Sequence, residues 1–171
     1  MMTPGRGGKM KKQELTNVMR ICAQKKAEYK PHYYETEEAV SGDVVARMIG
    51  EDPAHVFKTL VTVGKSGKNY VFVIPVMSEL DLKKAAAAAN EKNVEMLRSK
   101  ELLPLTGYVH GGCSPVGMKK FFPTFFDVSS SDCETLIFSA GRIGAQIEIK
   151  PSELSKVISF GTADLCREEK E

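Results

Sequence analysis

The stretch Gly-Tyr-Val-His-Gly-Gly-Cys-Ser-Pro-Val-Gly-Met-Lys-Lys, residues 107–120, carries the most informative pattern in the chain. Glycine lacks a Cβ, so Gly111 and Gly112 permit a positive φ and let another molecule approach the main chain closely. Ser114 and Pro115 are typical of the first positions of a helix. A glycine-rich bend before a helix start gathers unpaired N–H groups. This favours an anion site or an oxyanion hole, with a plain tight turn as the simpler alternative.

Length and composition indicate a single soluble domain. The 171 residues are 42% hydrophobic and 27% charged, which is ordinary for a globular protein. We expect a flexible leader over residues 1–12, one domain over 13–166 and a charged tail over 167–171. No apolar run approaches the ~18 residues that span a bilayer, and residues 1–8 lack the apolar core of a signal peptide. A cytoplasmic protein with no membrane partner is therefore expected.

The cysteine, histidine and charge patterns argue against several classes of protein. The four cysteines and three histidines are widely spaced, with no Cys-x-x-Cys, so we expect free thiols, no metal site and no cofactor. The net charge of +2 is too small for a protein that coats DNA or RNA. Basic residues nevertheless concentrate in residues 1–31 and 57–120. They could form a face that contacts a few phosphates, with solvated surface lysines as the alternative.

Apolar periodicity predicts interleaved helices and strands. Helices are expected at residues 15–22, 41–50, 78–89 and 95–103, with two more beginning at Ser114-Pro115 and at Pro151. Strands are expected at residues 29–35, 57–63, 70–76, 108–109, 135–138 and 145–149. Two links, 64–69 and 139–144, have hairpin composition, which a purely parallel sheet would not contain. We therefore predict an α/β (α+β) fold with a mixed, mainly antiparallel, curled sheet flanked by helices.

The stretch at 107–120 resembles the signature of the YbaK/EbsC family, the freestanding relatives of the prolyl-tRNA synthetase editing domain. Three further segments agree with this family and occur in its order: residues 56–61 (VFKTLV), 82–86 (LKKAA) and 139–149 (SAGRIGAQIEI). The resemblance implies a single editing domain with a partly closed barrel and helices around it. It also implies an enzyme that removes a wrong amino acid from tRNA, most typically cysteine from Cys-tRNA(Pro).

The resemblance also implies the catalytic residues. Lys58 sits in an otherwise apolar strand, where the pattern alone favours a lysine on the solvent side. The family's matching lysine, however, lies in the substrate pocket and is needed for activity. A cation there could hold the ester carbonyl, or a phosphate or hydroxyl of the terminal adenosine. The other catalytic candidates form the implied oxyanion hole: Gly111, Gly112, Cys113, Ser114 and Pro115.

Six further residues are expected to contact the substrate: Tyr34, Ser41, Thr59, Ser139, Gly141 and Arg142. Strand alternation places Thr59 on the opposite face from Lys58, so a structural role is its alternative. The glycines of residues 139–144 suit a hairpin turn, which is the alternative for that segment. Ser41 stands where the family often has an aromatic residue, so one wall of the amino-acid pocket differs from the family pattern.

Cys113 admits two interpretations. A thiol at a helix N-terminus has a lowered pKa and could act as a nucleophile or redox sensor. Only His110 lies near enough in sequence to serve as its base, and the family tolerates an apolar residue here, so we expect Cys113 to fill space. No Ser-His-Asp order, paired carboxylates or Walker loop is apparent. The family implies that the substrate's own thiol attacks the ester and leaves as a thiolactone, while the protein orients it and stabilises the oxyanion.

Several functions are compatible with this sequence. The leading hypothesis is a trans-editing deacylase acting on Cys-tRNA(Pro), with Cys-tRNA(Cys) as a further substrate. A close alternative removes alanine from Ala-tRNA(Pro). From other classes come a non-catalytic module that binds tRNA or a synthetase, and a thiol-redox protein that uses Cys113. The expected partners are the acceptor end of an aminoacyl-tRNA and prolyl-tRNA synthetase.

Overall fold

The computed structural model describes residues 15–168, so the expected leader and residues 169–171 of the expected tail lie outside the described part. Its helical elements are α2 (Asn17–Gln24), α3 (Gly42–Ile49), η1 (Pro53–His55), α4 (Leu82–Ala89), α5 (Ser99–Thr106), η2 (Val128–Asp132) and α6 (Pro151–Leu154). Its strands are β1 (Lys30–Tyr33), β2 (Phe57–Gly64), β3 (Asn69–Pro75), β4 (Val94–Met96), β5 (Thr124–Asp127), β6 (Leu136–Arg142), β7 (Ala145–Ile149) and β8 (Gly161–Ala163). Within residues 15–168, no helix has the length and apolar character needed to cross a bilayer.

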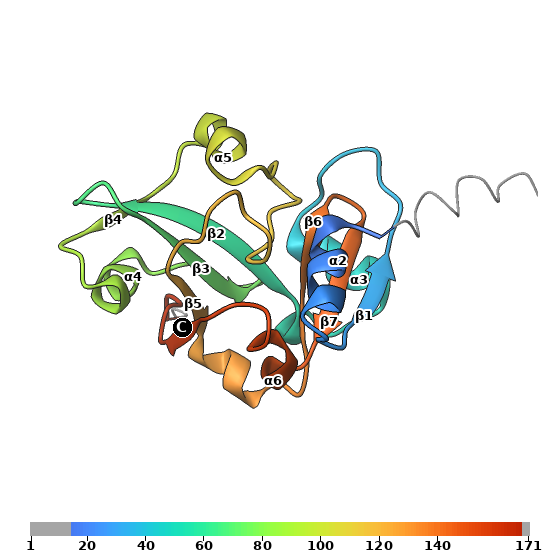
Figure 1. The fold of residues 1–171 in the computed structure, drawn as a ribbon. Coiled ribbons are helices and arrows are strands. Elements are labelled where there is room, and N and C mark those ends of the chain that lie inside the picture. Colours follow the sequence, from blue (N-terminus) through green and yellow to red (C-terminus); the bar gives the residue numbers. More distant parts are fainter. Residues whose placement is uncertain (1–14, 169–171) are drawn as a thin grey trace, which may run out of the picture.

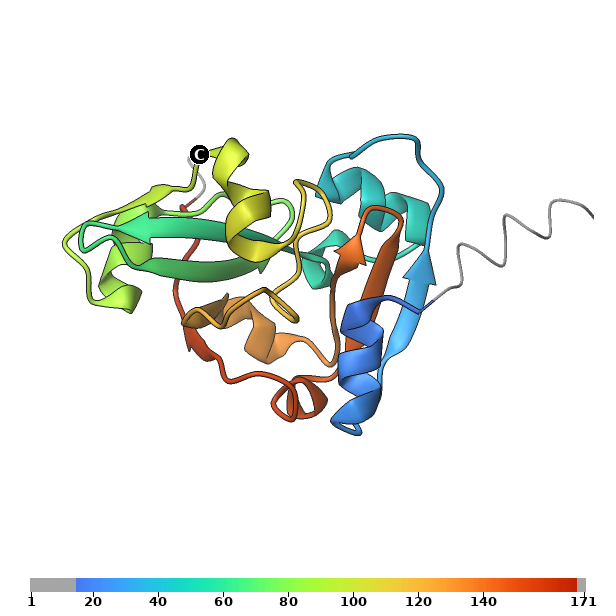
Figure 2. The same cartoon turned by 45° about the horizontal axis from the view of Figure 1, so that its top comes forward.

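The strands form two open sheets that lie side by side (Figures 1 and 2). The larger sheet has the order β4-β2-β3-β5-β8, with antiparallel pairing from β4 to β3 and parallel pairing from β3 to β8. The smaller sheet, β1-β7-β6, is antiparallel throughout. An isolated parallel bridge between Val56 and Ile137 links the two sheets. The predicted mixed, mainly antiparallel fold with flanking helices is confirmed, as two open sheets rather than one curled sheet.

An aromatic cluster joins the two sheets in the core. Phe126 of β5 is fully buried, and its ring centroid lies 6.3 Å from that of Phe57 on β2 and 6.2 Å from that of Phe138 on β6. Phe160 packs closer still, at 4.9 Å. Tilted and edge-to-face rings at these separations attract one another beyond the area that they bury. Phe126 therefore holds together segments that lie far apart in the sequence.

Two helices cover opposite faces of the smaller sheet. Val18 and Met19 of α2 pack in the same core cluster as Phe138. Ala46 of α3 packs instead with Val56 and Ile137. Because neighbouring strand residues point to opposite faces, every second residue of β6 and its partners on β7 face α3. Figure 1 shows α2 in front of this sheet and α3 behind it.

Local sequence signals fixed several helix ends correctly. Gly50 ends α3 with a φ of +74°, as its glycine predicts, and Asp52 accepts a hydrogen bond from the N–H of Ala54 at the start of η1. The helix expected from residue 78 begins later, because Asp81 is the N-cap of α4 and accepts from the N–H groups of Lys83 and Lys84.

Two predicted elements are wrong, and a third is displaced along the chain. No helix follows Ser114-Pro115, and Tyr108-Val109 is not a strand; residues 107–123 form a long irregular segment. The Ser114 hydroxyl accepts from the N–H of Val116, so it closes a local turn rather than a helix. The helix expected at 95–103 begins later and includes Pro104, because β4 takes up residues 94–96. Strands β5 and β8 were not predicted, since each is only three or four residues long.

The aromatic junction generates a stability prediction. Replacing Phe126 with alanine should lower the free energy of unfolding by about 3–5 kcal/mol, because the cavity left between the sheets has no other side chain to fill it. The matched control is Phe121→Ala, since Phe121 is 60% exposed and its loss should change stability by no more than about 0.5 kcal/mol. Urea denaturation of both variants measures the difference. Equal losses would show that Phe126 does not join the sheets.

Candidate active site

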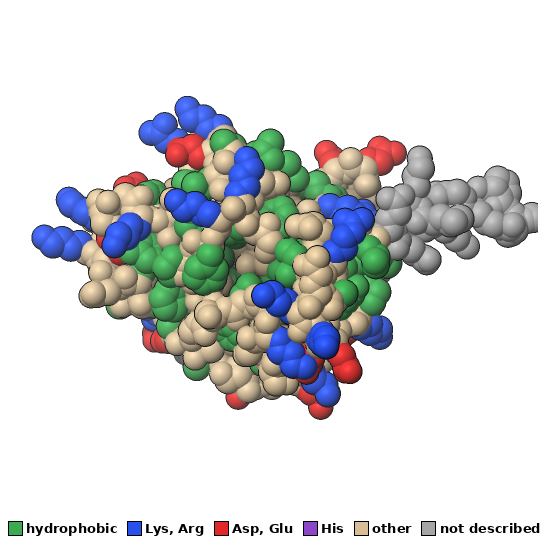
Figure 3. Space-filling model, viewed as in Figure 1, with side chains coloured by type: hydrophobic (Ala, Val, Ile, Leu, Met, Phe, Trp, Pro, Cys, Tyr) green, Lys and Arg blue, Asp and Glu red, His purple; other side chains and the backbone are tan. Residues whose placement is uncertain are grey.

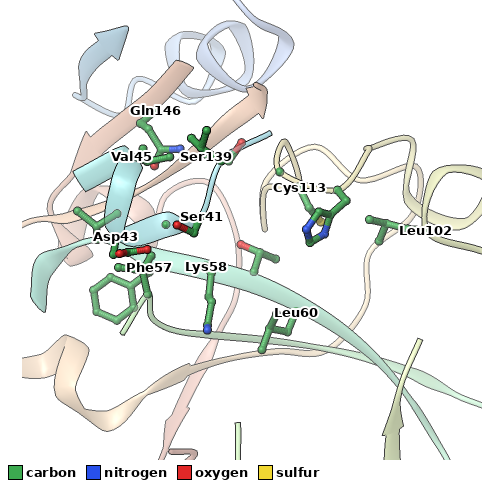
Figure 4. A pocket seen from close by; sticks show the side chains of 17 residues that line it. Ser41, Asp43, Val45, Phe57, Lys58, Leu60, Leu102, Cys113, Ser139 and Gln146 are labelled. Carbon is green, nitrogen blue, oxygen red and sulfur yellow. The ribbon is translucent and has the colours of Figure 1, made fainter. Parts of the chain in front are cut away.

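A cavity of about 310 Å³ opens where both sheets, α3 and the glycine-rich segment meet (Figure 4). Residues from distant parts of the chain form its walls. The start of α3 contributes Val40, Ser41, Gly42, Asp43 and Val45; the start of β2 contributes Val56, Phe57, Lys58, Thr59 and Leu60; the other walls contain Val76, Leu102, His110, Gly111, Cys113, Ser139 and Gln146. Three of the four motifs therefore contribute to this cavity. The fourth, residues 82–86 on α4, does not line it.

The β2 wall supplies the cation of the cavity. Lys58 is half-buried, and within residues 15–168 its ammonium group makes no hydrogen bond or ion pair. Its neighbour Thr59 also lines the cavity, and the buried hydroxyl oxygen of Thr59 has no hydrogen-bond partner in the described part of the chain. Strand alternation thus separates the two side chains, yet both reach the same space. A cation and a hydroxyl without partners leave polar capacity for a ligand.

The glycine-rich wall presents backbone donors. Gly111 has a φ of +89°, which favours glycine, and a Cβ on it would lie 2.7 Å from the Cβ of Ala39. The N–H of Gly112 donates to the carbonyl of Val109, so it is occupied in a turn. Within the described chain, the N–H groups of Gly111 and Cys113 donate to no acceptor. Two free N–H groups therefore lie at the cavity although no helix follows them.

The smaller sheet closes the cavity with a serine and a glutamine. Ser139 on β6 pairs with Gln146 on β7, and both lie on the sheet face that packs against α3. The Ser139 hydroxyl accepts from the N–H of Gly141 at the bulge where β6 turns into β7. Figure 4 shows Ser139 and Gln146 together, with the Lys58 side chain extending away from them and Cys113 and Leu102 across the cavity.

The other predicted site residues lie just outside the lining: Tyr34, Gly112, Ser114, Pro115, Gly141 and Arg142. These residues support the segments that line the cavity. A Cβ on Gly112 would lie 3.1 Å from the Cα of Arg142, so the main chains of these two segments touch. The N–H of Tyr34 donates to the carbonyl of Gly144, which anchors β1 to the same turn. Ser114 and Pro115 are buried beneath the glycine-rich segment.

Cys113 lines the cavity, and burial disfavours ionisation of its thiol. Burial raises its pKa to about 12, because the thiolate would lose its hydration. The helix N-terminus that would have lowered this pKa does not form. The thiol is therefore protonated at neutral pH, which favours the space-filling interpretation over the nucleophile and the redox sensor.

Three polar residues of the cavity, Asp43, His110 and Gln146, were not among the predicted site residues. Asp43 begins the first turn of α3, where an acidic residue is commonplace, and a hydrogen bond from the Ser41 hydroxyl contributes most to lowering the pKa of its carboxyl. Gln146 alternates with apolar residues in β7, a pattern that also describes a solvent-facing strand residue. Only the pairing of β7 with β6 reveals that it faces the cavity.

Comparisons with known proteins agree on one family. The model of the aminoacyl-tRNA editing domain matches residues 36–157. A protein of Enterococcus faecalis named as a candidate Cys-tRNA(Pro)/Cys-tRNA(Cys) deacylase, EbsC, is 43% identical over 162 residues, which cover 94% of this chain and 99% of that protein. The uncharacterized protein YwhH of Bacillus subtilis is 28% identical over 137 residues, covering 79% of this chain and 85% of that protein.

A solved structure shows the same fold. It is titled as a candidate trans-editing enzyme for prolyl-tRNA synthetase and superposes with a TM-score of 0.76 at 22% identity, covering 91% of this chain and 100% of its own. The family resemblance of the sequence motifs is confirmed, since the matched domain contains the cavity and all four motifs. The chain belongs to the family of aminoacyl-tRNA editing domains.

Proposed function

We propose that this protein is a trans-editing deacylase that removes cysteine from Cys-tRNA(Pro), with Cys-tRNA(Cys) as a further substrate. The observation that carries the proposal is a cavity in which Lys58 and two backbone N–H groups have no partner within residues 15–168, while burial keeps the thiol of Cys113 protonated. Such a site suits a reaction in which the substrate brings its own nucleophile. The kinship with EbsC, which is named for these two tRNAs, supports the choice of substrate.

The chemistry needs only positioning and charge stabilisation. The thiol sulfur of the cysteinyl group attacks its ester carbonyl carbon, and a C–S bond forms. The carbonyl oxygen becomes an oxyanion, which the N–H groups of Gly111 and Cys113 can stabilise. The C–O ester bond then breaks, the ribose oxygen takes up the proton that the thiol lost, and a thiolactone leaves. An alanyl or prolyl ester has no thiol to cyclise, so only a cysteinyl ester can be cleaved by this route.

Lys58 holds the acceptor end in this proposal. Its ammonium group has no partner within residues 15–168, so it can bind the ester carbonyl or an oxygen of the terminal adenosine without breaking an existing contact. Gly112, Ser114 and Pro115 keep the donor wall in place, while Tyr34, Gly141 and Arg142 support the turn behind Ser139. Ser41 and Thr59 contact the aminoacyl group from α3 and β2.

The tRNA body and the synthetase would meet the surface around the cavity. Lys and Arg side chains stand over α5 in Figure 3, where Arg98 and Lys100 are exposed at the start of that helix. Leu102 of the same helix lines the cavity, so an acceptor stem leaving the site would pass close to these cations. We infer a cytoplasmic location and an association with prolyl-tRNA synthetase, because a mischarged tRNA must be intercepted soon after it is made.

The first experiment measures hydrolysis of labelled Cys-tRNA(Pro), Cys-tRNA(Cys) and Ala-tRNA(Pro). We expect rapid loss of the cysteinyl esters and little loss of the alanyl ester. Lys58→Ala should lower kcat/KM by about 10²- to 10³-fold, the range for removing one stabilising group from such a site. Lys83→Ala is the matched control, since Lys83 is exposed on α4, and it should leave the rate unchanged.

Two outcomes would contradict the proposal. Selective loss of the alanyl ester would assign the protein to Ala-tRNA(Pro). Equal, slow loss of all three esters that Lys58→Ala does not change would indicate a module that binds tRNA or a synthetase without cleaving the ester.

The geometry of the donor wall generates a second prediction. Gly111 and Gly67 have nearly the same φ, +89° and +91°, but a Cβ on Gly67 meets open space, whereas one on Gly111 collides with Ala39. Gly67→Ala should therefore lower the free energy of unfolding by about 1–2 kcal/mol and leave deacylation intact. Gly111→Ala carries the same backbone strain and also displaces the donor wall, so kcat should fall. If both variants keep full activity, Gly111 does not shape an oxyanion hole.

The buried thiol of Cys113 generates a third prediction. With a pKa of about 12, it should react with iodoacetamide at pH 7.5 roughly 100-fold more slowly than free cysteine, because so little thiolate is present. Mass spectrometry of tryptic peptides after timed labelling of the folded protein gives this rate, with urea-unfolded protein as the control. Labelling of the folded protein at the rate of the unfolded chain would restore the nucleophile and redox hypotheses.

A further inference from the structure

Gln146 is a buried side chain with an unused acceptor. It lies in the middle of the smaller sheet, where its Cα pairs with His32 on β1 and with Ser139 on β6. Only 6% of its surface is exposed, and it lines the cavity. Within residues 15–168, its amide oxygen Oε1 is buried and receives no hydrogen bond. A buried polar atom without a partner is destabilising, so proteins keep few of them.

An amide oxygen can only accept a hydrogen bond, so the missing partner must be a donor. The Thr59 hydroxyl is also without a partner, but a hydroxyl can donate or accept and therefore does not specify what the ligand offers. Asp43 is the negatively charged rival acceptor in the cavity lining. Its carboxylate already accepts from Ser41 and lies 4.0 Å from the guanidinium of Arg47, so its charge is partly matched within α3.

We propose that the amide oxygen of Gln146 binds the α-ammonium group of the aminoacyl ester and so positions the substrate for cleavage. This inference rests on the proposed function. The ammonium is the strong donor next to the ester carbonyl, and a hydrogen bond from a charged donor is stronger than one from a neutral donor. The Lys58 side chain extends away from Gln146 and Ser139, so the two cations occupy separate ends of the cavity (Figure 4).

In this role, Gln146 selects substrates that carry a free α-amino group. Gln146 pairs with Ser139 on one wall, while Gly111 and Cys113, with their free N–H groups, lie on the glycine-rich wall. A substrate held by its ammonium at one wall presents its ester carbonyl to the space between them. Loss of the Gln146 contact should therefore weaken both binding and orientation, and it should do so only for substrates that carry the ammonium.

The test compares two esters of tRNA(Pro) that share a thiol. One is cysteinyl, and the other is 3-mercaptopropionyl, which lacks only the α-ammonium. The variant Gln146→Leu has similar volume and no acceptor; Gln24→Leu is the matched control, since Gln24 is exposed at the end of α2. Single-turnover deacylation gives kcat/KM for each ester with wild type and both variants, after subtraction of the spontaneous hydrolysis rate of each ester.

We expect wild type to favour the cysteinyl ester, and Gln146→Leu to lower its kcat/KM by about 10- to 100-fold. The same variant should leave the 3-mercaptopropionyl ester unchanged, while Gln24→Leu should change neither ester. Gln146→Glu should lower KM for the cysteinyl ester, because a carboxylate attracts the ammonium more strongly. The unfolding temperature of Gln146→Leu should equal or exceed that of wild type, since the variant removes a buried acceptor that has no partner.

Clear results would overturn the inference. If Gln146→Leu slows both esters by the same factor, Gln146 does not recognise the ammonium. If Asp43→Asn rather than Gln146→Leu removes the preference for the cysteinyl ester, the carboxylate on α3 is the recognition group. Failure of the proposed function looks different, because wild type would then leave both esters intact.

Discussion

The close approach of two main chains at Gly112 is the constraint on which the site depends. A Cβ at this position would lie 3.1–3.2 Å from the backbone of Arg142 and Ile143, tighter than ordinary packing allows. The absence of a side chain lets the irregular segment 107–123 lie directly on the turn between β6 and β7. That contact joins α5 and the glycine-rich wall to the smaller sheet, while the Phe126 cluster joins the two sheets from the opposite side. The cavity lies where these walls meet.

The free N–H groups that we propose as oxyanion donors arise from this packing rather than from a helix. An irregular segment has no repeating hydrogen bonds, so the N–H groups of Gly111 and Cys113 remain available at the cavity. The same burial that holds the segment in place raises the pKa of the Cys113 thiol to about 12. The free N–H groups and the protonated state of the thiol therefore share one cause. A site of this kind stabilises negative charge well and generates a nucleophile poorly, which suits a substrate that contains its own thiol.

The sequence predicted the hairpin strands, the end of α3 at Gly50 and the family because these features rest on local chemistry. Gly50 ends a helix and alternating apolar residues mark β2 whatever surrounds them. The error at Ser114 has a tertiary cause, since its hydroxyl closes a turn with Val116 and the segment is stabilised by contact with Arg142. Gln146 could not be assigned to the cavity from periodicity, because alternation in a strand does not reveal which face is solvent.

The polar groups without partners in this cavity are unfavourable for stability, which indicates a functional role. The oxygens of Thr59 and Gln146 and the cation of Lys58 would each be more favourable in water or with a partner of their own. A chain selected for stability alone would fill these positions with apolar residues, as it does at Ile137, Phe138 and Ile147 on the same two strands. That polar atoms stay unpaired beside such a well-packed core supports our proposal that a bound substrate completes their hydrogen bonds.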